Sequence, residues 1–197
     1  MEPAVEDRKQ RAAEDRALVA RLAEGDEQAL SALYDRYASM LLALAIRVVA
    51  DRAEGEEVLQ EVLMQAWRQA ERYNPDRSSV STWLVMMTRS RAIDRIRSRK
   101  VVDRTLAAAQ QEESRTHESP EGSRNVLHQE RAIRLRSELD ELPKEQKQVL
   151  ELAFFSGMTQ REIAAETQIP LGTVKTRTLL AMKKLRAALK DELRELL

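Results

Sequence analysis

Cysteine is absent from the chain, and this absence excludes disulfide bonds and thiolate metal sites. Glycine and proline occur only five times each among 197 residues, and aromatic residues make up 4% of the sequence. A sandwich or a barrel would need more turn residues than this. Apolar residues reach 43%, which is enough for helical cores. The composition therefore predicts an all-α protein with one domain or two small ones.

Histidine is also scarce, because only His117 and His128 occur, in or beside a polar segment. With no cysteine and no inward-facing histidine, a zinc site is not expected. The sequence contains no Gly-x-Ser-x-Gly elbow, no Walker loop and no Gly-rich dinucleotide fingerprint. We therefore expect no metal, no cofactor and no small-molecule substrate.

Long hydrophobic segments are missing too. The N-terminal stretch MEPAVEDRKQRAAEDR alternates acidic and basic residues and has no apolar centre, so it is not expected to be a signal peptide. The longest apolar-rich run, MLLALAIRVVA, is too short to span a bilayer and is interrupted by Arg47. A cytoplasmic protein is expected.

The formal net charge is zero, but the charges are segregated along the chain. Residues 84–104 contain seven basic and two acidic residues, and residues 171–190 contain six basic residues and no acidic one. Residues 51–66 contain five acidic residues and one basic residue. The neutral total thus conceals two basic patches that could bind phosphate, and one acidic patch.

Apolar residues recur at spacings of three and four in the N-terminal half, as on the buried stripe of a helix. This pattern predicts helices over residues 12–24, 27–50, 51–73 and 80–99. Asp26 and Asp51 are expected N-caps, and the stretch NPDRSS is expected to be a loop. The residues expected to face the core are Leu18, Val19, Leu22, Leu30, Leu33, Tyr34, Tyr37, Leu41, Leu44, Ala45, Val48, Val58, Leu59, Val62, Leu63, Ala66, Trp67, Trp83, Leu84, Met87, Ile93 and Ile96.

The helical pattern stops in the polar stretch QQEESRTHESPEGSRN, residues 110–125, which predicts a flexible linker. Further helices are expected over residues 126–142, 144–155, 160–166 and from about residue 172 onward. Gly157 should end the second of these helices, and Thr159 with Glu162 should form a capping box. We therefore expect a four-helix domain at 1–103, a linker at 104–127 and a helix-turn-helix domain at 128–197.

The stretch TQREIAAETQIPLGTVKTRTLLAMKKLRAAL indicates two helices joined by a sharp turn. In a helix-turn-helix the second helix lies in the major groove and offers its N-terminal residues to base edges. Arg and Lys suit guanine, and the Thr methyl suits thymine. The alternative is an antiparallel helical hairpin with solvated lysines. The candidate base-contacting residues are Thr173, Lys175, Thr176, Arg177 and Leu179.

A second basic feature lies upstream, where Arg91, Arg95 and Arg99 recur every four residues and so share one helix face. Such a stripe can track a phosphate backbone, and the polar loop at 74–81 could receive an unstacked base. The alternative is an ordinary surface helix.

The acidic patch places Glu54, Glu57 and Glu61 on one helix face. Paired carboxylates can serve in acid/base catalysis or bind a hard cation, but no ligand loop or catalytic partner accompanies them. A docking face for a basic partner and a solvated acidic face both remain open.

These features, in this order, resemble the bacterial sigma factors of the extracytoplasmic-function (ECF) group in the sigma-70 family. ALYDRYASMLLALAIRVVAD is similar to the opening of the first conserved domain of that group, and AEGEEVLQEVLMQAW to its polymerase-binding helix. STWLVMMTRSRAIDRIRSR resembles the segment that reads the −10 promoter element. LPKEQKQVLELAFFSGMTQREIAAETQIPLGTVKTR resembles the domain that reads the −35 element.

The resemblance implies a protein that is not an enzyme but gives promoter specificity to one. The partners it implies are core RNA polymerase, at the clamp helices and the flap, promoter DNA, and an anti-sigma factor that is often membrane-anchored. For core polymerase it implies Asp51, Glu54, Glu57, Gln60, Glu61 and Leu63. For the melted −10 strand it implies Asn74, Arg77, Ser78, Ser79, Trp83, Ser90, Arg91, Asp94 and Arg95. For the −35 duplex it implies Arg161, Thr173, Lys175, Thr176, Arg177, Leu179, Leu180, Lys183 and Lys184.

Three positions depart from the pattern of the group. Ser90 stands where many relatives have Asn, and Gln168 stands in the turn where relatives usually have Gly, so it would need a positive φ. Leu179 and Leu180 stand where relatives are often polar, and they could contact thymine methyls or pack within the domain. The alternative function is an autonomous helix-turn-helix regulator that binds duplex DNA without polymerase. A helical adaptor that binds acidic proteins is a third class, but it leaves the helix-turn-helix unexplained.

Overall fold

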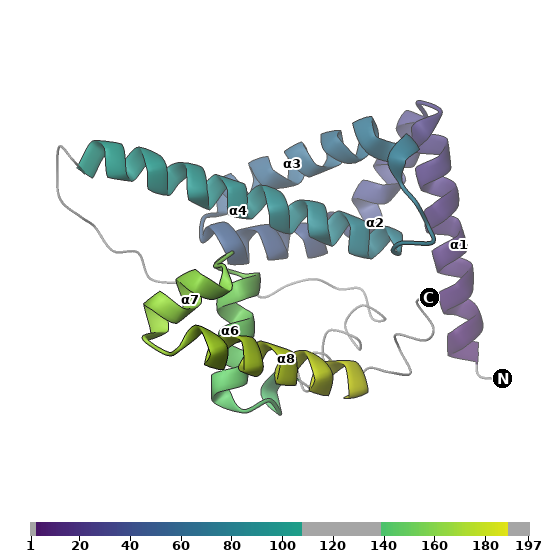
Figure 1. Ribbon diagram of the computed structural model, residues 1–197. Coiled ribbons are helices and arrows are strands. Elements are labelled where there is room, and N and C mark those ends of the chain that lie inside the picture. The colour runs from purple at the N-terminus through teal and green to yellow at the C-terminus, as the bar shows by residue number, and fades with distance from the viewer. Residues whose placement is uncertain (1–2, 108–138, 189–197) are drawn as a thin grey trace. The chain divides into compact units, whose positions relative to one another are not determined.

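The computed structural model describes residues 3–107 and 139–188, with side chains for residues 9–99 and 139–188. Within these ranges every regular element is a helix (Figure 1). The chain divides into two compact units, Met1–Gly122 and Ser123–Leu197. The predicted all-α class with two helical regions is therefore confirmed. The linker predicted at 110–125, both histidines and most of the helix predicted at 126–142 lie outside the described residues.

In its described residues the first unit contains α1 (Pro3–Ala23), α2 (Glu27–Val49), α3 (Arg52–Gln69), η1 (Ala70–Arg72) and α4 (Val80–Ala107). Two predicted N-caps are confirmed, because Asp26 accepts from the first turn of α2 and Asp51 accepts from the backbone N–H of Glu54. Two helices are longer than predicted. The first begins at Pro3 rather than near residue 12, and α4 runs to Ala107, into the range expected to be linker.

Helix α2 is the central helix of the first unit, since it packs against α1, α3 and α4 (Figure 1). Its buried residues are Ala29, Leu33, Tyr37, Leu41, Ala45, Val48 and Val49. Tyr34 was expected among them but is 49% exposed. It follows Leu33 by one residue, and one residue is about 100° of helix rotation, which turns its ring away from the stripe. The prediction for Tyr34 is therefore wrong.

Helix α2 is also long and apolar enough to cross a membrane by length and composition alone. The core helix of a folded domain passes the same test, because it too carries a continuous apolar stripe. The seven buried side chains of α2 and its three packed neighbours identify it as such a core helix.

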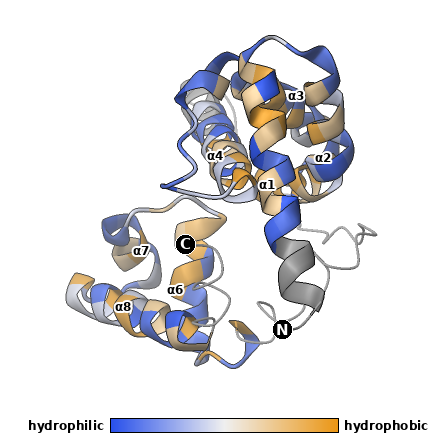
Figure 2. Cartoon of the chain, turned by 90° about the vertical axis from the view of Figure 1, so that its right-hand side faces the viewer, coloured by the Kyte–Doolittle hydropathy of each residue, from blue (hydrophilic) through white to orange (hydrophobic). Residues whose placement is uncertain are grey.

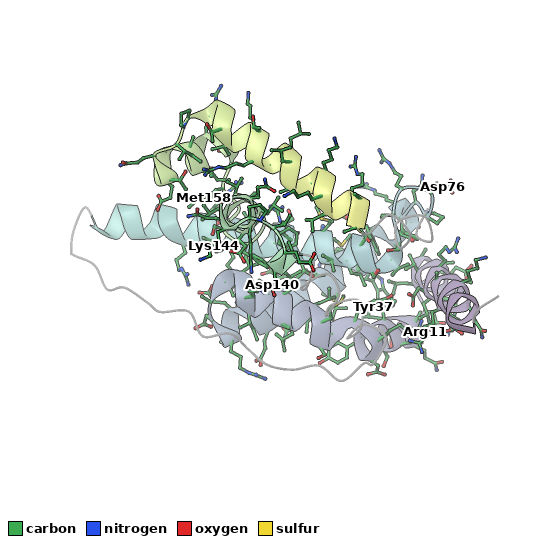
Figure 3. All side chains as sticks on the ribbon, turned by 90° about the horizontal axis from the view of Figure 1, so that it is seen from below. Arg11, Tyr37, Asp76, Asp140, Lys144 and Met158 are labelled. Carbon is green, nitrogen blue, oxygen red and sulfur yellow. The ribbon has the colours of Figure 1, made fainter. Side chains whose placement is uncertain are left out.

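A cluster of hydrogen bonds and ion pairs links α1 to α2. The carboxylate of Asp15 accepts from the Tyr37 hydroxyl and from the Arg36 guanidinium, and Glu14 lies 3.2 Å from the same guanidinium. Tyr37, labelled in Figure 3, is only 2% exposed. Burial raises the pKa of its hydroxyl, and the hydrogen bond to Asp15 raises this pKa further. A buried carboxylate of this kind needs such partners, because an unpaired one would be costly.

The second unit contains α6 (Lys144–Phe154), α7 (Gln160–Thr167) and α8 (Leu171–Ala188). Val149, Ile163 and Val174, one from each helix, form its buried cluster, and Ala164 and Met158 pack against them (Met158 is labelled in Figure 3). Hydrophobic and hydrophilic segments alternate along α8 in Figure 2. The burial of Ile163 and Val174 and the packing of Ala164 against them confirm the predicted inward orientation of these residues.

The ends of these helices follow the sequence closely. Gly157 has a φ of 63°, and the side chain of Thr159 accepts from the backbone of Glu162 while the Glu162 carboxylate accepts from the backbone N–H of Thr159. Both the glycine stop and the capping box are confirmed. Gln168 ends α7 in the left-handed region, with φ 54° and ψ 31°. This residue therefore adopts the conformation that favours glycine.

Candidate functional site

Helices α7 and α8 form the helix-turn-helix expected from the sequence. Only residues 168–170 separate them, and the Pro170 carbonyl accepts from the backbone N–H groups of Thr173 and Val174 to open α8. Ile163 and Val174 are both fully buried and hold the two helices together. The outward side of α8 is therefore fixed, and it is the side that can meet a DNA groove.

The outward side of α8 is basic. Lys175, Lys183 and Lys184 are exposed, and Arg177 is half-buried. Residues 171–188 contain no acidic residue. Within the described ranges, none of these four cations is ion-paired with an acidic side chain. Their charge is thus available to a phosphate backbone.

The threonines and leucines of α8 differ in what they can offer. The Thr176 hydroxyl donates to the Gly172 carbonyl one turn earlier, so its methyl group and its acceptor lone pairs remain. Leu179 is 69% exposed and Leu180 is 43% exposed. Their exposure excludes packing of Leu179 into the described core of its own unit. Contact of Leu179 with thymine methyl groups stays a prediction.

The loop before α4 is held by its own side chains. The Asn74 side-chain oxygen accepts from the backbone N–H of Asp76 at 2.8 Å, and the Asn74 carbonyl accepts from Arg77 at 3.2 Å. The Tyr73 hydroxyl donates to the Ser78 carbonyl at 2.9 Å. These bonds make a closed turn with an exposed Arg77 at its outer edge.

An aromatic pair lies at the base of that loop. The rings of Tyr73 and Trp83 lie 5.1 Å apart between centroids, at 48°. Ser79 accepts from the backbone N–H of Thr82 at 3.2 Å and so caps the start of α4. A short polar loop beside an aromatic pair is a suitable surface for an unstacked base, because rings stack on bases.

Helices α3 and α4 face one another along a row of charged side chains. The guanidinium of Arg95 donates to the carboxylates of Glu57 and Glu61, the latter at 3.2 Å, and lies 3.9 Å from Glu54. Three acidic residues assigned to the polymerase face are thus held by one arginine assigned to the DNA stripe. The residues assigned to polymerase and the arginine assigned to DNA therefore lie on one surface, which the sequence did not reveal.

The row continues one turn away on each side. Arg91 donates to the Gln65 side chain at 2.7 Å, and Arg99 donates to Glu54 at 3.2 Å. Residue numbers rise along α4 as they fall along α3, so the two helices run in opposite directions. We call the seven side chains the α3–α4 seam, comprising Glu54, Glu57, Glu61, Gln65, Arg91, Arg95 and Arg99.

The other residues implied by the resemblance occupy varied environments. Gln60, Ser90, Asp94 and Arg161 are exposed. Asp51 uses its side chain to cap α3. Leu63 is only 8% exposed, since it packs into the core of its own unit, so little of it can contact a partner.

No group of three or more histidine, cysteine, aspartate or glutamate side chains in the described part of the chain could hold a metal ion. The sequence missed the Asp15–Tyr37 cluster, because its two residues lie far apart in the chain and neither stands in a motif. It also missed the seam, because helix periodicity predicts faces but not which faces meet.

Comparison with known proteins identifies the class. Residues 33–101 match the family model described as Sigma-70 region 2, and residues 132–185 match Sigma-70, region 4. The ECF RNA polymerase sigma factor RpoE of Cereibacter sphaeroides is 34% identical over 161 residues, covering 82% of this chain and 86% of the relative. The ECF RNA polymerase sigma factor SigK of Mycolicibacterium vanbaalenii is 32% identical over 179 residues, covering 88% of each. The solved Rhodobacter sphaeroides SigE in complex with the anti-sigma ChrR is 28% identical, covers 87% of this chain and 95% of that one, and has a TM-score of 0.42.

The two matched regions are those of a sigma-70 family transcription factor. The chain belongs to the extracytoplasmic-function sigma factors. It is thus a sigma factor that directs promoter-specific transcription with core RNA polymerase, as the resemblance predicted. The alternative of an autonomous regulator is not favoured, since the region 2 match covers most of the first unit.

Proposed function

We propose that the two units divide promoter recognition between them. The second unit holds the −35 element as duplex DNA with α8, and the first unit binds core polymerase and the melted −10 strand. The observation that supports this division most directly is the difference between the two basic surfaces. The cations of α8 are not ion-paired within the described ranges, while Arg95 of α4 is held by carboxylates.

On the −35 side, Lys175 and Arg177 lie in the N-terminal half of α8, where a reading helix contacts base edges. Thr173 and Thr176 flank them, and Lys183 and Lys184 further along are suited to phosphates. Arg161 of α7 is exposed and suited to the backbone beside the groove. Each bidentate base contact discriminates by about 1–3 kcal/mol.

On the −10 side, the loop at 74–79 would receive an unstacked base beside Trp83 and Tyr73, with Arg77 reaching phosphate. Extracting a base costs a few kcal/mol in lost stacking. Free protein should therefore bind promoters weakly, and the polymerase complex should supply the remaining contacts. Ser90 and Asp94 are exposed on α4, where they can reach the strand.

The polymerase face is assigned to α3, with Glu57, Gln60 and Glu61 outward. Its chemistry suits a basic partner. The chain itself would carry out no catalysis, and it would act in the cytoplasm. An anti-sigma factor, which is often membrane-anchored, would hold it inactive, as ChrR is found in complex with SigE.

Transcription in vitro tests the division of labour. Core polymerase alone is compared with core plus the protein on family-type promoters, and Lys175→Ala and Arg177→Ala are compared with Lys144→Ala, an exposed lysine of α6. We expect initiation only with the protein, a loss of −35 recognition in the first two variants, and unchanged core binding in all three. Loss of core binding in Lys175→Ala would contradict the division, and unaided footprints on duplex DNA without initiation would favour the autonomous regulator.

A second experiment tests the polymerase face. Glu61→Lys should weaken core binding, because it reverses a charge on the exposed side of α3. Glu56→Lys is the matched control on the same helix, where Glu56 pairs with Arg52 at 3.0 Å and lies outside the seam. Equal core affinity of Glu61→Lys and Glu56→Lys would remove the case for this face.

A further inference from the structure

The α3–α4 seam lies between the surface of α3 that we assign to polymerase and the surface of α4 that we assign to DNA. Arg95 is the central residue, because its guanidinium contacts Glu54, Glu57 and Glu61 together. Its side chain is 28% exposed, and those of Glu57 and Glu61 are 59% and 50% exposed. The ion pairs are therefore within reach of an incoming partner, and they are not locked in a dry core.

Within the seam, the paired charges weaken each other's attraction for an outside partner. A guanidinium has five N–H donors in a fixed fork, and it grips phosphate best when two of them are unoccupied. Glu57 and Glu61 each occupy one donor of Arg95, on its two terminal nitrogens, and their negative charges oppose the approach of a phosphate to the guanidinium. Glu57 and Glu61, in turn, present less net negative charge to a basic partner while Arg95 is bound to them. The free protein thus masks part of its polymerase face with part of its DNA face.

We propose that the seam is an exchangeable lock that couples polymerase binding to capture of the melted strand. Basic side chains of the polymerase replace Arg95 at Glu57 and Glu61, and the released Arg95 then turns to a phosphate of the strand. This inference rests on the proposed assignment of α3 to polymerase and α4 to DNA. Coupling of this kind is reciprocal, so strand binding also raises affinity for polymerase.

The ion pairs of Arg95 with Glu57 and Glu61 are weak enough for the cations of a partner to displace Arg95. Exposed ion pairs are weak and are screened by salt, so a partner that offers equivalent cations can displace Arg95 at little cost. A deeply buried pair could not act in this way, because removing one partner would leave an uncompensated charge. Arg91 and Arg99 stay on Gln65 and Glu54 and preserve the register of the two helices.

The test uses the free, full-length protein and a fluorescent single-stranded oligonucleotide, with anisotropy measured over a series of salt concentrations. The double variant Glu57→Gln/Glu61→Gln removes two of the three negative charges that hold Arg95 and keeps the shape of both side chains. The control Glu27→Gln/Glu56→Gln makes the same change in net charge on exposed residues outside the seam. The triple variant Glu57→Gln/Glu61→Gln/Arg95→Ala removes the released cation.

We expect the double variant to bind the strand about fivefold more tightly than the control, with a salt slope steeper by about one phosphate contact. The triple variant should lose this gain. Equal affinity of the double variant and its control would overturn the lock, and so would a gain that persists in the triple variant. Circular dichroism before each titration identifies any variant that is not folded, and the single variant Glu57→Gln then takes its place.

Core binding of the same variants separates this inference from the proposed function. Glu57→Gln/Glu61→Gln should weaken core binding, while Arg95→Ala should strengthen it about threefold by unmasking the carboxylates. If core binding is unchanged in the double variant, the proposed polymerase face is wrong. If core binding falls but strand affinity matches the control, or if Arg95→Ala weakens core binding, the lock alone is wrong.

Discussion

Gly55 of α3 lies so close to Ile46 of α2 that a Cβ on Gly55 would stand 2.6 Å from Cγ1 of Ile46 and 3.2 Å from its backbone nitrogen. Real Cβ atoms do not approach another atom to that distance, so Gly55→Ala must displace the Ile46 side chain or push α3 away from α2. Overpacking of this kind costs about 1–3 kcal/mol. We expect the free energy of unfolding, measured by urea denaturation, to be lower by about that amount than in Gly172→Ala, where the same gain in helix propensity applies.

Gly172→Ala is the matched control for Gly55→Ala, because a Cβ at Gly172 meets nothing within 4 Å. It should leave stability unchanged or raise it slightly, since Ala favours helix over Gly by about 1 kcal/mol. A Gly55→Ala protein as stable as Gly172→Ala would show that the approach of the two helices is not tight.

Gln168 closes α7 with a φ of 54°, where a side chain is strained and glycine is not. Gln168→Gly should therefore stabilise the second unit by about 1 kcal/mol. Gln168→Ala keeps the Cβ and should give no gain. Thermal unfolding of the three proteins, followed by circular dichroism, measures the difference, and an equal gain in Gln168→Ala would exclude backbone strain as the cause.

Tyr37 should make the protein sensitive to alkali. Its pKa is raised in the folded state by burial and by Asp15, above the ordinary value of 10.0. A raised folded pKa contributes stability that is complete below the unfolded pKa and is lost as pH rises above it. The free energy of unfolding should therefore fall above about pH 10, at up to about 1.4 kcal/mol per pH unit.

Two variants isolate that effect. Tyr37→Phe should be less stable at neutral pH, because Asp15 loses a partner, and it should show a flatter decline above about pH 10. Tyr34→Phe removes an exposed hydroxyl from the same helix and should follow the unmodified protein. Parallel curves for Tyr37→Phe and the unmodified protein would assign the alkaline loss to other groups.

Leu179 is exposed on the reading helix, so Leu179→Ala should change the free energy of unfolding by less than about 0.5 kcal/mol. If its role is contact with thymine methyl groups, the same variant should weaken binding of −35 duplex. Replacing the thymines with deoxyuridine removes those methyls. The two changes should then be non-additive in a double cycle of affinities, whereas additive losses would place Leu179 elsewhere.

Local signals in the sequence were enough for most of the fold. Asp26, Asp51 and the Thr159–Glu162 box mark helix starts because a side-chain oxygen satisfies backbone donors only a few residues away. Gly157 marks a helix end for an equally local reason, because glycine tolerates a positive φ. Such features depend on neighbours in the chain, which the sequence lists directly.

Contacts between helices were less predictable. The periodic pattern placed Tyr34 inward because it counts apolar residues and does not fix the centre of the stripe to within one residue. Arg95 and Glu61 were each given an external partner, although they bind one another across 34 positions of sequence. Which helix faces meet depends on the angle and distance at which the helices cross. A single glycine in the sequence did not predict that α3 approaches α2 closely at Gly55.

Among the described residues, two that are not glycine adopt the left-handed region, Ala50 at the end of α2 and Gln168 at the end of α7. Neither residue is charged, and neither belongs to the seam or to the candidate base-contacting residues of α8. Ala50→Gly and Gln168→Gly would therefore act as two separate adjustments, each raising the thermal tolerance of one unit alone. A pair of proteins altered in this way could be used to ask which unit limits the working lifetime of the factor in the cell, without changing any charge that polymerase or DNA would meet.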